Sequence, residues 1–428
     1  MHTAARAQNA TAAVVELTPA WINQLAQEMA TTHPGMKAAY ARTNAAAQNL
    51  ASIRSWKDPM ARLGGMLSKE EMRAEDGDLL YGIEQELPLF GKPRLARDVA
   101  HGELLTEQAS TDYRFQILRR DLTILVFRTA LTEEEVNIGQ QDLTWLESLS
   151  QSLETRYQSG LASLSEVLTV QNERSRRATR LQTDRNRLDH DHFSLNRLLN
   201  REPQSRWPSL QLPPLARPVA YNRQLIDLAQ RHEPKLKVYR EQIRQAEATV
   251  ARTRRERLPD VNVGVEGRNY TGDGSFRQGM VFFSLNLPWV NKHKYQSAVR
   301  REEARLRETE HEHQDYALGV REEVHELVQK IDAARREALS YREEIIPRSQ
   351  SALESTQAAW QAGRSSLREV LEANRMLLEA RLMWARALAM QYELLSELVL
   401  CCGLGDLEAL EMIGVAPLAK EEHLLKDG

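Results

Sequence analysis

Two short runs hold the residues of this chain whose types could bind a metal ion, Asp189-His190-Asp191-His192 and His311-Glu312-His313. On a helix, residues two apart point about 200° away from each other, so the two histidines of the first run cannot easily share an ion. His311 and Asp315 share one helix face, but no third ligand accompanies them. We therefore interpret both runs as solvated helix residues and expect no metal site.

The remaining chemistry-bearing residue types give no sign of an enzyme. Cys401 and Cys402 are the only cysteines and are adjacent, which suits neither a disulfide framework nor a zinc site. The sequence contains no glycine-rich phosphate loop, no nucleophile elbow and no H-E-x-x-H motif. We therefore expect no catalysis and no cofactor. The net charge of −3 gives no indication of a nucleic-acid partner.

The composition favours long helices over compact globular domains. Of 428 residues, 6% are aromatic and 27% are charged, which is typical of amphipathic helices with one apolar stripe. No run of about 18 apolar residues occurs, so a transmembrane helix is excluded. The short apolar patch Ala10–Val15 is too small for a secretory signal. Either the chain stays in the cytosol, or its natural precursor carries a leader upstream of this numbering.

An internal repeat about 200 residues long organises the chain. Leu87–Lys92 (LPLFGK) returns as Leu287–Lys292 (LPWVNK), and Tyr157–Leu168 (YQSGLASLSEVL) returns as Trp360–Leu371 (WQAGRSSLREVL). A repeat of this length is a duplicated domain half, because solenoid units are only 20 to 50 residues long. Each half is expected to hold a helix, a strand pair, a very long helix, a turn and another long helix.

The proposed boundaries follow from prolines, glycines and the hydrophobic period. We expect an N-terminal segment 1–18, a first repeat 19–201, a proline-rich linker 202–221, a second repeat 222–403 and a tail 404–428. The expected strands cover about 60–68, 77–87, 261–270 and 279–287. The expected long helices cover 93–158, 164–201, 292–361 and 365–402. The first of these would span about 100 Å, and the third should kink at Pro347.

The strands alternate apolar and polar residues over 9 to 11 positions. This is the length and period of a tilted strand that crosses a bilayer. A soluble half-buried sheet is the alternative, and Gln85 on the apolar face counts against the membrane interpretation. The residues expected to face lipid are Tyr81, Ile83, Leu87, Val261, Val263, Val265, Val281, Phe283, Leu285 and Leu287.

The helices carry a seven-residue period. Leu371, Leu378 and Ala385 stand seven apart, which predicts helices packed side by side as in a coiled coil. Asn374 and Arg381 interrupt a neighbouring row. We interpret these interruptions as a sign that the helices contact water on one side.

The duplicated order of strand pairs, very long helices and G-x-x-S-x-x-E-V-L turns resembles the TolC-type outer-membrane efflux proteins over nearly the whole chain. Tyr81–Lys92 resembles in particular the branch associated with heavy-metal resistance. The resemblance implies an α+β membrane protein that assembles as a homotrimer. Its twelve-stranded barrel lies in the outer membrane and continues as a helical barrel in the periplasm. Four strands cannot close alone, and open edges are not viable in lipid, which permits two, three or four chains per barrel.

The resemblance also implies passive conduction. Substrate would arrive from an inner-membrane pump, usually proton-driven, through a periplasmic adaptor that docks at the helix turns. The docking residues implied are Tyr157, Gly160, Ser163, Gly363 and Ser366. The aperture residues implied are Glu369 and Glu372, with Trp360, and with Arg364 or Arg368 replacing an arginine of the family whose position is Ser365 here.

These roles have simpler, purely structural alternatives. The turn residues can merely permit the chain to reverse, and Glu369 can be a solvated helix charge. The alternative function is a soluble coiled-coil scaffold, which predicts almost no sheet. The alternative substrates are drugs or other small organic compounds.

Overall fold

The computed structural model describes residues 14–66 and 79–409, which fall into two compact units. The sheet unit contains the described residues of Ala38–Tyr113 and Lys235–Ala317. The tip unit contains those of the remaining three segments, among them Arg114–Pro234. Each unit draws on both sequence repeats. The long helices α3 (Lys92–Gln158) and α7 (Lys292–Ser340) run from one unit into the other, and the first residues of α2 and α6 also belong to the tip unit.

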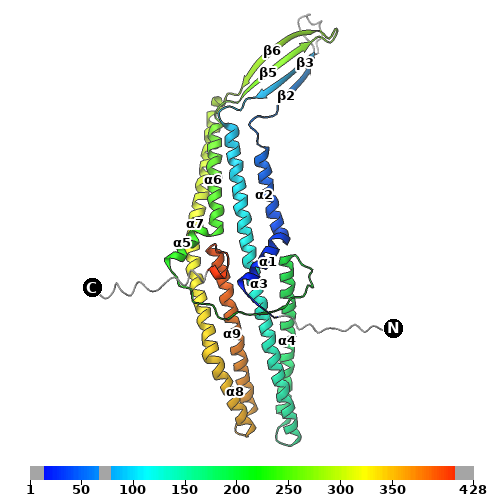
Figure 1. The fold of residues 1–428 in the computed structure, drawn as a ribbon, viewed down its shortest axis with the longest axis vertical. Helices are drawn as coiled ribbons and strands as arrows, with labels where there is room; N and C mark the ends of the chain where they lie inside the picture. Colours follow the sequence, from blue (N-terminus) through cyan, green and yellow to red (C-terminus); the bar gives the residue numbers. More distant parts are fainter. Residues whose placement is uncertain (1–13, 67–78, 410–428) are drawn as a thin grey trace, which may run out of the picture. The chain divides into compact units, whose positions relative to one another are not determined.

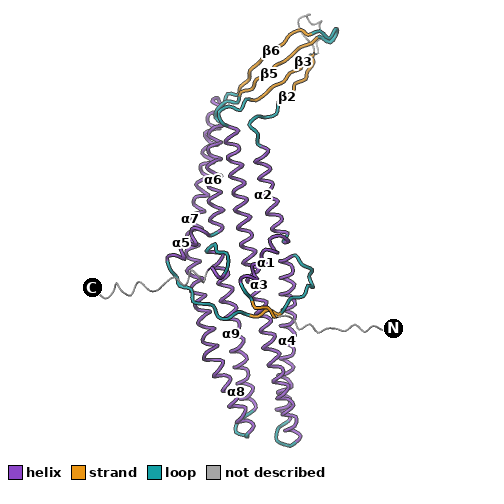
Figure 2. The backbone as a smooth tube through the Cα atoms, viewed as in Figure 1, coloured by secondary structure: helices purple, strands orange, loops and turns teal. Residues whose placement is uncertain are grey.

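The sheet unit joins the strand pairs of the two repeats into one antiparallel sheet (Figures 1 and 2). Its order is β2-β3-β5-β6, so the repeats meet where β3 pairs with β5. The strands are β2 (Met60–Gly65), β3 (Leu79–Glu86), β5 (Val261–Asn269) and β6 (Phe276–Leu285). The helices of this unit are α2 (Pro34–Ser52), α6 (Pro234–Arg255) and the first parts of α3 and α7, and a 3-10 turn covers Pro288–Asn291.

The tip unit consists mainly of helices that pair through tight turns. Its helices include α1 (Pro19–Thr32), α4 (Leu164–Leu199), α5 (Arg223–His232), α8 (Ile346–Gln361), α9 (Leu367–Cys401) and the remaining parts of α3 and α7. The two turns lie between α3 and α4 and between α8 and α9. One apolar core includes Leu153, Val170, Leu353 and Leu371, which come from all four of these helices. The two repeats therefore share one core beside the turns.

Several expected elements differ from the observed ones, and three of these differences have local reasons. β6 begins at Phe276, three residues before the expected start, and gives way to a 3-10 turn at Pro288. The expected helix 365–402 begins at Leu367 because Ser366 caps it. The expected helix 292–361 is interrupted by a π-helical turn at Tyr341–Ile345. Pro347 follows that turn directly and has no N–H to continue an α-helical ladder.

The proline-rich segment 202–221 is more than a linker. It contains β4 (Ser209–Gln211), which pairs in parallel with β1 (Val14–Glu16) from the expected N-terminal segment. The density of prolines predicted an extended chain but did not indicate which strand it pairs with. Parts of the expected segments 1–18, 60–68, 77–87 and 404–428 lie outside the described residues. In the parts of the chain that the structure describes, no helix combines the length and apolarity needed to cross a membrane.

Candidate functional site

One face of the sheet is apolar and exposed in the single chain. Ile83 lies in register with Val265, and Val265 with Val281, which makes a row across three strands. Their side chains are 56%, 55% and 64% exposed. Isolated exposed apolar residues are common on soluble proteins, but a continuous row of them marks a surface that something apolar covers.

Of the other residues expected on this face, Leu87 and Leu287 lie just beyond the ends of β3 and β6, and the rest lie in the register of the sheet. Tyr81, Phe283, Leu285 and Leu287 are exposed, whereas Leu87, Val261 and Val263 are half-buried. Gln85 lies in the same row as Val263 and Phe283, so it does interrupt the apolar face. Its amide donates hydrogen bonds to the carbonyls of Lys57 and Glu86, which satisfies the polar group near the end of β3.

The opposite face of the sheet is polar and internally paired. Glu84 is only 2% exposed, forms an ion pair with Arg62 and accepts a 3.3 Å hydrogen bond from Ser284 Oγ. Arg268 lies 3.4 Å from Glu266 on the same face. A sheet with one apolar and one charged face cannot bury both, so it suits a wall between lipid and water.

Two glycines let aromatic rings lie flat on the sheet. The ring of Phe282 occupies the space beside Gly264, where a Cβ atom would overlap it. Tyr81 covers Gly267 in the same way, and its hydroxyl donates a 3.0 Å hydrogen bond to Asn269. These contacts fix the register between neighbouring strands. In the described sheet, β2 and β6 each keep one edge without a partner strand.

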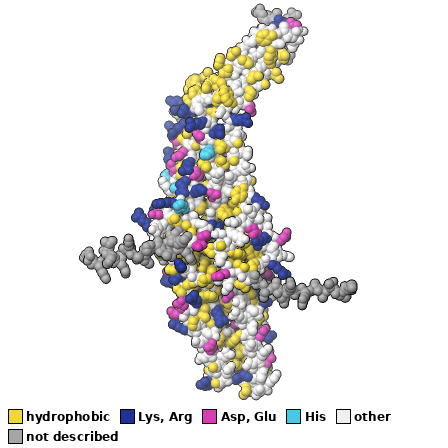
Figure 3. Space-filling view, viewed as in Figure 1, with side chains coloured by type: hydrophobic (Ala, Val, Ile, Leu, Met, Phe, Trp, Pro, Cys, Tyr) yellow, Lys and Arg dark blue, Asp and Glu magenta, His cyan; other side chains and the backbone are white. Residues whose placement is uncertain are grey.

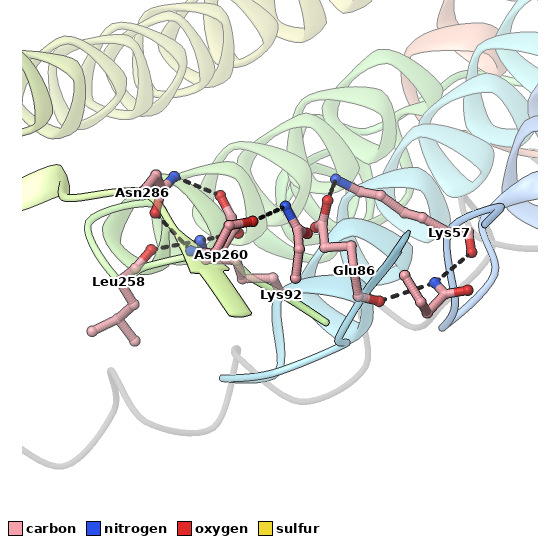
Figure 4. A network of polar contacts seen from close by, with 9 residues as sticks. Lys57, Glu86, Lys92, Leu258, Asp260 and Asn286 are labelled. Carbon is pink, nitrogen blue, oxygen red and sulfur yellow. Dashed lines mark hydrogen bonds and ion pairs between the residues drawn. The ribbon is translucent and has the colours of Figure 1, made fainter. Parts of the chain in front are cut away.

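A polar network ties the strand ends to the helices that follow them (Figure 4). Lys92 Nζ lies 2.6 Å from Asp260 Oδ1 and donates a 2.6 Å hydrogen bond to the carbonyl of Leu258. Asn286 and Asp260 exchange two further hydrogen bonds. Nearby, Lys57 Nζ lies 2.7 Å from Glu86. The network joins the start of α3 to β5 and β6, so it connects the two repeats.

The two turns of the tip unit have the same construction. Gly160 and Gly363 have φ of +73° and +72°, a region that favours glycine. Leu161 N donates to Arg156 O and Arg364 N donates to Ala359 O, both at 2.8 Å. These bonds close the helix ends in the manner of a Schellman motif. The duplicated sequence therefore produces a duplicated turn.

Serines at the same repeat position start the helices that follow the turns. The Ser163 hydroxyl accepts from Glu166 N, and the Glu166 carboxylate accepts from Ser163 N at 2.7 Å, which completes a capping box. Ser366 caps α9 by accepting from Glu369 N. Hydrogen bonds from Ser365 and Ser366 lower the pKa of the Glu369 carboxyl. Glu369 therefore has a local structural role as the counterpart of Glu166.

The remaining residues expected at the turns lie in three different environments. Trp360 is buried in the shared core, with the Arg156 guanidinium 4.8 Å above its ring. Arg364 and Arg368 are exposed, and in the described residues neither lies within ion-pair distance of a carboxylate. Glu372 is exposed and lies 3.9 Å from Arg375. Tyr157 is also exposed.

Sequence reasoning missed the contacts that link the repeats beside the turns. Asn374 of α9 donates a 2.7 Å hydrogen bond to Asp142 of α3, and Arg177 of α4 lies 2.7 Å from the same carboxylate. Burial raises the pKa of Asp142, against the opposing effects of Asn374 and Arg177. Arg375 donates a 2.9 Å hydrogen bond to Glu173.

The heptad interruption at Asn374 was the sequence signal for this network, but we interpreted it as a wet face. That interpretation is wrong for Asn374, which is 8% exposed and bonded to Asp142. Arg381, the second interruption, donates to Gln350 of α8. In the described residues no three His, Cys, Asp or Glu side chains are grouped to hold a metal ion.

Comparison with known proteins gives a family match for part of the chain. Residues 225–403, which form most of the second repeat, match the family described as outer membrane efflux protein. No match is found among curated proteins.

Several solved structures share the fold along nearly the whole chain. The outer membrane protein VceC of Vibrio cholerae is 18% identical, with a TM-score of 0.74 over 90% of this chain and 97% of that one. The outer-membrane channel OprN is 17% identical, with a TM-score of 0.76 and 90% of each chain covered. CusC, described as forming a transmembrane channel, is 15% identical, with a TM-score of 0.75 over 91% and 93% of the two chains.

Proposed function

We propose that this chain, whose second repeat carries the outer membrane efflux protein signature, is the exit duct of a tripartite efflux system in the bacterial outer membrane. It conducts substrate passively, without catalysis. The observation that carries this proposal is the four-stranded sheet with an exposed apolar row on one face and paired charges on the other. The alternative function, a soluble coiled-coil scaffold, does not require a sheet with an exposed apolar face.

The free edges of β2 and β6 support assembly into a closed barrel. In lipid, unpaired backbone groups cost several kcal/mol each, so each edge requires a partner strand. Pairing β6 of one chain with β2 of the next satisfies both edges. Three copies give twelve strands, the arrangement that the family resemblance implies. The apolar row then faces lipid and the Glu84 face lines the lumen.

The tip unit supports a role in docking and gating in the periplasm. The two exposed turns, with Tyr157 and the caps Ser163 and Ser366, present similar surfaces to a periplasmic adaptor. Glu372, Arg364 and Arg368 are exposed beside the second turn and are available to ring an aperture in a trimer. The bonds Asn374–Asp142 and Arg375–Glu173 hold α9 against the first repeat. These bonds oppose outward movement of α9.

The proposed substrate is a heavy-metal cation delivered by a proton-driven inner-membrane pump, with drugs or other small organic compounds as the second candidate. The resemblance of Tyr81–Lys92 to the metal-resistance branch supports the first. Growth of a deletion strain on copper, silver, zinc, cobalt and cadmium, and separately on a drug panel, distinguishes them. Sensitivity to drugs alone would contradict a metal substrate.

Two measurements test the duct itself. The protein should fractionate with the outer membrane and migrate as a trimer that heating converts to monomer. In planar bilayers, Arg375→Ala should raise the single-channel conductance, whereas Arg174→Ala, which removes an exposed arginine of α4 and leaves the Glu173 contact intact, should not. A protein that stays monomeric in the soluble fraction without detergent would refute the proposal.

A further inference from the structure

Exposed cations gather where the helices of the sheet unit meet its strands. Figure 3 shows Lys and Arg side chains gathered near the ends of α6 and α7. The eight residues, here called the cationic belt, are Arg54, Arg94, Arg97, Arg255, Arg257, Lys292, Lys294 and Arg300. All are exposed, and within the described residues none has a carboxylate within 4 Å. The whole chain carries a net charge of −3, so this positive charge is local.

Helix stability accounts for Arg255 at the end of α6, where a cation is favoured, but not for the cations at the starts of α3 and α7. The N-terminus of a helix carries partial positive charge and favours acidic residues. The first turns of α3 and α7 contain no acidic residue and instead carry Arg94 in one case and Lys292 and Lys294 in the other. These cations interact unfavourably with the helix dipole, at a cost of about 0.3 to 1 kcal/mol each. An anion bound from outside the chain would offset that cost.

The two sequence repeats differ at this point. Lys92 is neutralised by Asp260 at 2.6 Å and serves the polar network of the fold. Lys292 occupies the same position of the repeat but has no such partner among the described residues. The structural role of the lysine is therefore confined to the first repeat, and in the second its charge is free to bind.

Exposed aromatic and apolar residues lie between the belt and the apolar face of the sheet. Trp289 is 59% exposed and Val290 is 70% exposed, and they directly precede the cations of α7. Phe90 takes the corresponding place before α3 and is 43% exposed, while Trp56 beside Arg54 is 56% exposed. The order from apolar row to tryptophan to cation matches the layers of a membrane interface, from hydrocarbon to headgroup.

A cleft of about 960 Å³ lies within this region and is lined by Trp56, Lys92, Lys294 and Tyr295 among other residues. Lys92 is already paired, whereas Lys294 lies 5.6 Å from the ring of Tyr295 and has no carboxylate within 4 Å among the described residues. Four carboxylates also line the cleft: Glu86, Glu256 and Asp260 are paired with Lys57, Arg252 and Lys92, and Asp58 is the fourth. The cleft therefore offers aromatic walls and the ammonium group of Lys294. This combination suits a phosphate that carries an apolar tail.

We propose that the cationic belt binds the phosphate headgroups of anionic phospholipids in the leaflet that borders the helices, which fixes the depth of the sheet in the membrane. The inference rests on the proposed function, because it requires the apolar face to lie in lipid. Charge complementarity and the aromatic residues favour a lipid over a soluble anion. A soluble anion would pair with the cations but would leave the rings of Trp56 and Trp289 exposed to water.

The test uses the full-length chain in a neutral detergent. Dibrominated phosphatidylglycerol is titrated in, and quenching of tryptophan fluorescence gives its apparent affinity. Dibrominated phosphatidylcholine is the zwitterionic probe. Because each cation near an anionic surface is worth roughly fivefold in binding, the anionic lipid should bind at least about tenfold more tightly. This preference should fall in 0.5 M NaCl, where charges are screened.

A matched pair of variants assigns the effect to the belt. The fourfold variant R255Q/R257Q/K292Q/K294Q should lose the preference for the anionic lipid. The control R174Q/R176Q/R217Q/R223Q removes the same charge from exposed residues of the tip unit and should keep it. If the fourfold variant does not fold, the charge-conserving R255K/R257K/K292R/K294R should retain the preference.

Three results would overturn the inference. They are equal affinity for the two lipids, a fourfold variant that keeps the wild-type preference, and full displacement of the lipid by millimolar inorganic phosphate, which would indicate a site for a soluble anion. The heat-dependent trimer is measured on the same preparations. A wild-type trimer without lipid preference refutes only the belt, whereas absence of the trimer refutes the proposed duct.

Discussion

Replacing Val281 by arginine tests whether the apolar face of the sheet lies in lipid. Val281 is the sixth of the ten residues of β6 and ends the row that begins at Ile83. At this mid-strand position an arginine facing the bilayer midplane costs about 2 to 4 kcal/mol. In a trimer the change occurs three times, which gives about 6 to 12 kcal/mol per assembly. On a soluble exposed sheet the same change costs less than about 0.5 kcal/mol.

Met280 supplies the matched control on the same strand. It is in register with Glu266 on the polar face, and its side chain is 43% exposed. Met280→Arg adds the same side chain beside a carboxylate in the proposed lumen, so its cost should be close to zero. The two variants differ in the face that receives the charge and by one residue along the strand.

Unfolding in urea from lipid vesicles, followed by the heat-dependent trimer band, measures both costs. A loss of 6 kcal/mol lowers the assembly equilibrium by roughly four orders of magnitude. The Val281→Arg trimer should therefore be undetectable under conditions in which the Met280→Arg trimer is intact. Free energies of unfolding that agree within about 0.5 kcal/mol per chain would refute the assignment of the two faces.

Three further predictions concern the tip unit. Gly363→Ala should lower the free energy of unfolding by about 1 to 2 kcal/mol, because φ is +72° and the cost is therefore backbone strain, not a clash. Gly319→Ala is the control, since Gly319 lies within α7 with equally open space beside it. It should raise the free energy of unfolding by up to about 1 kcal/mol, because alanine favours a helix more than glycine does. The thiols of Cys401 and Cys402 should resist maleimide at pH 7.5 until the protein is unfolded, since both are buried and burial raises the pKa of Cys402 to about 12; rapid labelling of the native protein would contradict this. Ser365→Ala should raise the pKa of Glu369, because the Ser365 hydroxyl is the main cause of its lowering. The ionised Glu369 carboxyl stabilises the fold at pH values above its unfolded pKa, and this stabilisation is lost as the pH falls through its folded pKa. The variant should therefore lose the stabilisation at a higher pH than the wild type. Carboxyl NMR of labelled glutamate measures the folded pKa in both proteins.

The sequence determined the elements of each repeat because their signals are local. Alternation at every second residue placed the strands, and the hydrophobic period placed the long helices, although Ser366 was not recognised as the cap that starts α9. Glycine at 160 and 363 predicted reversals, and both residues have positive φ. The errors lie where a partner is distant in sequence. Nothing in Ser209–Gln211 indicates that it pairs with Val14–Glu16.

The roles of individual polar residues needed the tertiary structure. Glu369 and Glu372 look equivalent in sequence, yet hydrogen bonds to the first engage it in a cap, while the second is exposed and lies 3.9 Å from Arg375. Asn374 looks like a flaw in a heptad, yet Asp142, 232 residues away, gives it a buried partner. Spacing along one helix fixes which residues share a face. Only packing between helices of different repeats decides which of them meet, because that depends on contacts the local sequence does not encode.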